Sequence, residues 1–178
     1  MREPYIVLGQ YVPTIWEARR IGEEILSIIA ATGFTPAPER HAWPGAAWRS
    51  FDLNAEVRGP ELPDSTDHLW HQDGNIDWVP VIWSTSCPTE IVLADSLVEE
   101  KLECECCSKL VLRPGTTIFQ PKPFEIIAFE NKKVFHRRPA EATTPRWFFR
   151  HMLFLTFGLQ ERIAMGTLRE QEEIVTLL

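Results

Sequence analysis

The sequence predicts an all-β core with one flanking helix near the N-terminus. One amphipathic helical pattern is followed by many short β-type runs, and turn residues separate these runs. The chain of 178 residues contains 14 prolines, about 8% where about 5% is average, which favours many turns over a helical bundle. Its 7 Trp and 10 Phe and its 24% of charged residues exclude general disorder. One helix followed by short strands is typical of a β-sandwich or barrel with a helix packed outside it.

The helix is expected at 14–32. Thr14 and Glu17 have the spacing of a capping box, and Gly33 is a stop signal. The apolar stripe of this segment consists of Ile15, Ala18, Ile21, Ile25, Ile28 and Ile29.

A loop is expected at 33–48, and the remaining pattern is one of short strands. These are predicted at 49–57, 68–73, 78–86, 89–94, 97–103, 109–113, 116–119, 124–130, 133–136 and 146–157. The tail 159–178 has an apolar spacing compatible with a terminal helix. No linker or repeat divides the chain, so we expect 1–178 to form a single domain. Its N-terminal helix and loop region is 1–60 and its catalytic core is 68–157.

Charge and cysteine content limit the partners and the compartment. A net charge of −7 argues against a duplex nucleic-acid binder. No apolar run reaches the ~20 residues of a membrane span, and no apolar leader follows Met1. We therefore expect a cytoplasmic protein without a membrane partner, and with its four cysteines reduced. The C-x-x-C of residues 104–107 has no second pair nearby, so a zinc site is not favoured there.

The most informative fragment is His71-Gln72-Asp73. On a strand, residues i and i+2 point to the same face, so His71 and Asp73 would present an imidazole and a carboxylate side by side. His136 lies at the end of a later apolar run and supplies a distant second imidazole. Two histidines and one carboxylate form the facial triad that suits Fe(II) and leaves coordination positions open.

Two arginines follow His136 at short spacing. Arg146 and Arg150 are separated by an even number, so on a strand both point to one face. A guanidinium that projects into a barrel beside a metal requires a carboxylate partner. By the same alternation, His68 and His151 are expected to point away from the proposed pocket.

With these parts the chain resembles the iron(II)/2-oxoglutarate-dependent dioxygenases, in particular their taurine dioxygenase and phytanoyl-CoA hydroxylase-like branch. The resemblance rests on 71–73, on 113–115 followed by 126–136, and on 146–150, and it covers about 68–157. It implies a double-stranded β-helix, that is, a jelly-roll or cupin-like core. The chain departs from the family in its short length and in lacking a glycine-rich stretch after the first ligands, where 87–91 stands instead.

The resemblance also implies site residues. His71, Asp73 and His136 would bind Fe(II), and Arg146 would pair with the distal carboxylate of the cosubstrate 2-oxoglutarate. Arg150 would hold either an anionic substrate group or the cosubstrate. Thr89 is a candidate hydrogen-bond donor to 2-oxoglutarate, and its competitors for that role are Ser84, Thr85 and Ser86.

The expected activity is hydroxylation of a C–H bond in a small-molecule or peptide substrate, with consumption of O₂ and release of succinate and CO₂. In related halogenases the carboxylate ligand is absent, so Asp73 favours hydroxylation or desaturation. Two alternatives stay open. One is a cupin-type metal enzyme that does not use 2-oxoglutarate, and the other is a non-enzymatic jelly-roll binding protein. A homodimer is compatible with the exposed β edges that are expected.

Overall fold

The protein is described here by a computed structural model, which covers residues 3–36, 47–50, 55–63, 68–73, 78–101, 108–139 and 142–156. Within these residues the chain is mostly antiparallel β-sheet with one α-helix, α1 (Ala18–Thr32). This agrees with the predicted all-β core and flanking helix. None of the helices in the described residues is long and apolar enough to cross a membrane.

The main sheet has the strand order β1-β8-β4-β10-β2, and β3 also pairs with β10. The 11-residue strand β10 contacts β4 along one side, and β3 and β2 share its other side. The strands of this sheet are β1 (Tyr5–Gln10), β2 (Ala47–Ser50), β3 (Glu56–Glu61), β4 (Val79–Ser84), β8 (Glu125–Phe129) and β10 (Arg146–Thr156).

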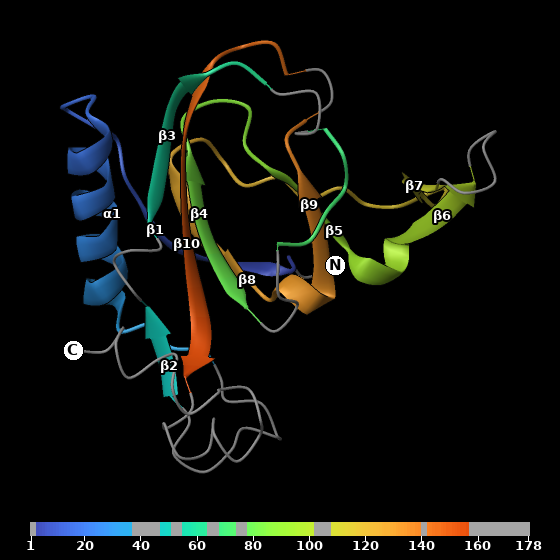
Figure 1. Ribbon diagram of the computed structural model, residues 1–178, viewed down its shortest axis with the longest axis horizontal. Helices are drawn as coiled ribbons and strands as arrows, with labels where there is room; N and C mark the ends of the chain where they lie inside the picture. Colours follow the sequence, from blue (N-terminus) through green and yellow to red (C-terminus); the bar gives the residue numbers. More distant parts are fainter. Residues whose placement is uncertain are drawn as a thin grey trace, which may run out of the picture.

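Two further strand pairs complete the described β-structure. Strand β5 (Glu90–Leu93) pairs with β9 (Val134–Arg137), and β6 (Leu97–Lys101) pairs with β7 (Ser108–Leu112). Short 3₁₀ turns, η2 (Ala94–Ser96) and η3 (Asn131–Lys133), lead into β6 and β9. Single bridges extend the β5–β9 pair on both sides, from His71 to His136 and from Ile91 to Phe119. Figure 1 shows α1 on one side of the main sheet, and β5 and β9 on its other side.

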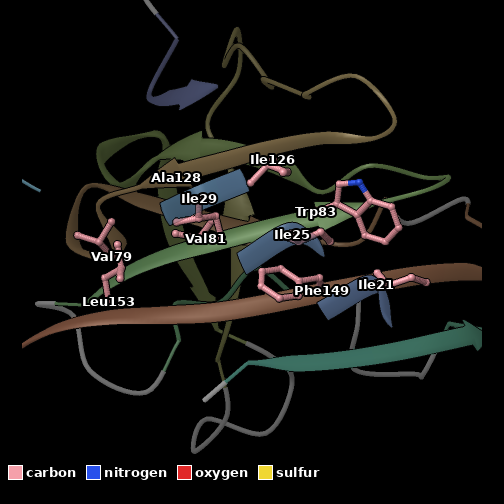
Figure 2. Close-up of a cluster of buried hydrophobic side chains, with 10 residues drawn as sticks. All are labelled: Ile21, Ile25, Ile29, Val79, Val81, Trp83, Ile126, Ala128, Phe149 and Leu153. Carbon is pink, nitrogen blue, oxygen red and sulfur yellow. The ribbon is translucent and has the colours of Figure 1, made fainter. Parts of the chain in front are cut away.

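The first core lies between α1 and the main sheet. Ile21, Ile25 and Ile29 recur at helical spacing on the buried face of α1. Figure 2 shows these side chains over residues that alternate along the strands, with Phe149 among them. The sheet contributes Val79, Val81, Trp83, Ile126, Ala128, Phe149 and Leu153.

The second core lies on the other face of the main sheet. Its members alternate with those of the first core, because successive side chains on a strand point to opposite faces. On β10, Phe149 belongs to the first core and Phe148 to the second. The second core consists of Tyr5, Ile82, Ile91, Ile127, Phe129, Val134 and Phe148. Arg146 and Arg150 share the strand face of Phe148, which is the side that carries β5 and β9.

The predicted helix start is wrong by four residues. The helix begins at Ala18, because Glu17 is extended (φ −132°, ψ 131°) and makes no side-chain cap hydrogen bond. Trp16 packs instead on Trp147, with ring centroids 6.0 Å apart. The predicted stop is confirmed, since Gly33 adopts the left-handed conformation (φ 64°) that ends a helix.

Most central strands lie within one or two residues of their predicted bounds, but the N-terminal strands do not. Strand β1 was not expected, and the run predicted at 49–57 is replaced by β2 and β3. The runs at 68–73 and 116–119 form only the single bridges at His71 and Phe119. The tail 159–178, most of the loop 33–48 and the cysteines at 104–107 lie outside the described residues. Cys87 is a free thiol.

Candidate metal centre

His71 and His136 are direct cross-strand neighbours. The backbone N–H of His71 donates to the carbonyl of His136 at 3.1 Å, and the N–H of His136 donates back at 3.0 Å. This is a hydrogen-bonded antiparallel pair, so both side chains leave the same face. Their ring centroids are 4.4 Å apart. His136 is buried with Val134 on the inner face of β9, whereas the side chain of His71 is exposed to solvent.

The regular ladder stops after His71. Continuing the register would pair Asp73 with Val134, but side chains replace the backbone bonds there. The Asn131 amide accepts from the Asp73 N–H at 3.1 Å and donates to the Asp73 carbonyl at 2.5 Å. The Gln72 amide donates to the carbonyls of Asn131 and Val134, at 2.6 and 3.1 Å. Asp73 is therefore held beside β9 without being part of a strand.

The structure brings together three of the residues singled out in the sequence. One ligand atom from each of His71, Asp73 and His136 lies within 4.8 Å of the others. Asp73 Oδ2 is 3.4 Å from His136 Nε2 and has no hydrogen-bond partner among the described residues. Ligand atoms bound to one ion at about 2.1 Å lie about 3 Å apart when they subtend a right angle. This cluster can therefore bind a metal ion, and the exposed His71 is the ligand with most freedom to adjust.

The protonation states suit metal binding. Burial lowers the pKa of His136, and the nearby Asp73 carboxylate offsets this only in part. Burial opposes ionisation of Asp73, but the polar contact with His136 and the charge of Arg150 outweigh it and lower the pKa of this carboxyl. His71 Nδ1 lies 2.8 Å from the Leu69 carbonyl, to which it must donate, so Nε2 is the nitrogen of this ring that is available to a metal ion. A neutral imidazole and an ionised carboxylate are the forms that coordinate metals.

Arg150 is a partner of the cluster's carboxylate. One of its terminal nitrogens donates to Asp73 Oδ1 at 2.8 Å, and the other donates to Glu56 Oε2 at 3.0 Å. Asp73 Oδ1 is thereby occupied, and Oδ2 faces His136. Glu56 belongs to β3 and was not singled out in the sequence. Its role depends on the pairing of β3 with β10, where Glu56 stands opposite Arg150.

Arg146 lies four residues back on the same strand face. Its side chain is only 6% exposed, donates to the Cys87 carbonyl at 3.2 Å and covers the Phe148 ring at 4.5 Å. Four residues of strand correspond to about 13 Å, so Arg146 and Arg150 mark two separate points along one face. Thr89 is buried two residues after Cys87, just before β5.

The other candidates have local partners. Thr85 Oγ1 accepts from the Trp147 N–H at 3.0 Å, and the Ser86 hydroxyl donates to the Pro145 carbonyl at 2.9 Å. Both hydroxyls thus join the end of β4 to the start of β10. Ser84 is buried at the end of β4. His68 Nδ1 contacts the Pro139 carbonyl, and His151 packs near Phe149 on the face opposite Arg150, as alternation predicted.

Arg137 fixes the chain that leads into His71. Its guanidinium stacks on Trp70, 4.1 Å from the ring centroid, and pairs with Glu90 at 2.8 Å. Glu90 and Arg137 are cross-strand partners on β5 and β9. The contact therefore connects the segment before His71 to both strands of the small sheet.

Comparison of the chain with protein-family models, with curated proteins and with solved structures finds no match.

Proposed function

We propose that the protein is an Fe(II)- and 2-oxoglutarate-dependent oxygenase with a jelly-roll core, acting as a hydroxylase. The observation that carries the proposal is the His71–Asp73–His136 cluster on the inner side of the small sheet, facing the strand that bears Arg146 and Arg150. The donor set supports the metal, because two imidazoles and a carboxylate suit a borderline divalent ion such as Fe(II) and leave room for further ligands.

The arrangement of strands also supports the proposal. A bridge on each edge extends the β5–β9 pair, which lies across the second core from the main sheet. Two antiparallel sheets around one core are expected of a jelly roll. The candidate ligands come from the small sheet and the arginines from β10, so the cluster faces the interior between the sheets.

In the proposed enzyme the two arginines have different tasks. Arg150 is engaged by Asp73 and Glu56, so we assign it to orienting the carboxylate ligand. Arg146 is buried farther along the same face, and we assign it to the distal carboxylate of 2-oxoglutarate. This dicarboxylate has a charged group at each end of a five-carbon chain, which suits two contacts separated along a strand. Thr89 is buried two residues after Cys87, whose carbonyl accepts from Arg146, and we propose it as the hydroxyl that bonds the cosubstrate.

When bound, Fe(II) would supply activation of O₂ coupled to oxidative decarboxylation of 2-oxoglutarate. The chain would contribute the three ligands and a buried arginine for the cosubstrate. The lowered pKa values of His136 and Asp73 favour the neutral imidazole and the ionised carboxylate, which are the forms that coordinate a metal.

The test is an anaerobic titration of metal-free protein with Fe(II) and then with 2-oxoglutarate, followed through the visible metal-to-ligand charge-transfer band. The band should appear in wild type, disappear in Asp73→Ala and weaken in Arg146→Ala. Arg113→Ala, at an exposed arginine outside the site, is the matched control and should retain it. Fe(II) binding without the band would favour a cupin-type metal enzyme instead. No metal binding by wild type would refute the enzymatic proposal.

A further inference from the structure

We infer that Asn131 and Gln72 are positioning residues that hold the carboxylate ligand Asp73 at the metal centre. The inference rests on the proposed function, since it concerns the same metal. One irregularity of the backbone supports it. Where a regular strand would bond the backbone of the candidate ligand Asp73, side-chain amides form the hydrogen bonds instead.

Asn131 imitates a strand partner. A residue in an antiparallel ladder donates its N–H and accepts at its carbonyl from one partner residue. The Asn131 side chain performs both tasks for Asp73, at 3.1 and 2.5 Å. Asn131 is fully buried, and Asp73 is only 7% exposed. Removing the amide would leave two buried backbone groups without these partners, so the backbone of Asp73 would shift to find others.

Gln72 bonds the same region from the segment that carries His71 and Asp73. Its amide donates to the carbonyls of Asn131 and Val134, so it occupies the acceptor that Asp73 would have used in a regular ladder. Asn131 lies at the start of η3, and Val134 begins the strand that bears His136. The amides thus connect the segment of the first two ligands to the segment of the third, across 58 residues of sequence.

The consequence concerns the direction of the Asp73 side chain. The bonds from Asn131 fix the backbone of Asp73 at the place from which its side chain reaches His136 and Arg150. Partners of this kind orient ligands, and their loss typically weakens metal affinity about ten- to hundredfold. The hydrogen bonds described here join the Asn131 and Gln72 amides to backbone groups, so through these bonds they act on the position of Asp73.

The experiment compares Co(II) binding by wild type, Asn131→Ala and Gln72→Ala, each prepared metal-free. The readouts are the dissociation constant, the visible spectrum of bound Co(II) and the unfolding temperature with and without metal. Gln120→Ala is the matched control, because its amide also donates to a backbone carbonyl, that of Pro88 at 2.8 Å, outside the metal centre. We expect affinity to fall about ten- to hundredfold in Asn131→Ala, less in Gln72→Ala and not at all in Gln120→Ala.

A merely structural role would give a different result. It would lower the unfolding temperature equally with and without Co(II) and leave the dissociation constant and spectrum unchanged, which would overturn the inference. If Asn131→Ala does not fold, Gln72→Ala, which alters a half-buried side chain, decides the question by the same readouts. If wild type itself binds no divalent ion, the proposed function fails together with the inference. If wild type binds Co(II) and both variants bind it with the same dissociation constant and spectrum, the inference alone fails.

Discussion

Replacement of Gly59 by alanine should destabilise the protein at the strand that supports Arg146. Gly59 lies on β3 with φ +144°, a conformation that side-chain-bearing residues rarely adopt. A Cβ atom there would lie 2.7 Å from Trp147 Cα and 2.9 Å from the Arg146 carbonyl oxygen. Both are backbone atoms of β10, at the point where its register with β3 shifts. The neighbours are therefore unable to move away by a side-chain rotation.

The expected loss has two parts. The unfavourable backbone conformation costs about 1–3 kcal/mol, and the overpacking adds about 1–3 kcal/mol. We expect a total near 3–4 kcal/mol. Gly115→Ala separates the two parts, because Gly115 also has a positive φ (+78°) but nothing within 4 Å of its added Cβ. This control should lose only about 1–2 kcal/mol. Urea unfolding followed by tryptophan fluorescence measures both, and equal losses in the two variants would refute the role assigned to the contact with β10.

Three further perturbations address the core, the small sheet and the cluster. Phe149→Ala removes a fully buried ring beneath α1 and should lower the free energy of unfolding by about 3–5 kcal/mol in urea; a loss below about 1 kcal/mol would contradict the described packing. Arg137→Met removes the pairing with Glu90 and the stacking on Trp70, and should cost about 2 kcal/mol by thermal unfolding, whereas no change would show that these contacts are unimportant. In metal-free protein, stability should fall as the pH drops below about 6.5, because burial lowers the pKa of His136 and only the unfolded chain accepts the proton. His136 alone can change the free energy of unfolding by at most about 1.4 kcal/mol per pH unit. If the same pH dependence remains in His136→Gln, it comes from other residues.

The sequence was sufficient for the central strands because their patterns are strong. Strand β4 is buried along its whole length, and β10 alternates between two cores. The alternation rule also predicted correctly that Arg146 and Arg150 share one face and that His151 does not. The edge strands were harder to predict. Strand β3 contains Gly59 and Pro60, which normally indicate a turn, and its place in the sheet depends on pairing with distant β10.

The candidate site, like the fold, was predicted only in part. That His71, Asp73 and His136 lie together agrees with the spacing argument, although that argument assumed a regular strand through 71–73. The structure has one bridge at His71, followed by bonds from side chains. Asn131 was not predicted, because nothing local distinguishes an asparagine in a turn from one that bonds a distant backbone. Glu56 was missed because its contact requires the register between β3 and β10.

The charges around the cluster affect which further ligands a metal ion bound there would favour. The guanidinium of Arg150 contacts two carboxylates, those of Asp73 and Glu56, so these three groups together carry a net charge of −1, and burial lowers the pKa of His136 toward its neutral form. A divalent cation bound in this largely buried place would therefore be only partly compensated by these groups. Burial of uncompensated charge is costly, so an anionic ligand from outside these groups would stabilise the bound ion. A dicarboxylate that chelates the ion at one end, as in the proposed function, would supply this charge. The same arrangement disfavours a structural metal site, in which the protein itself normally completes the ligand set.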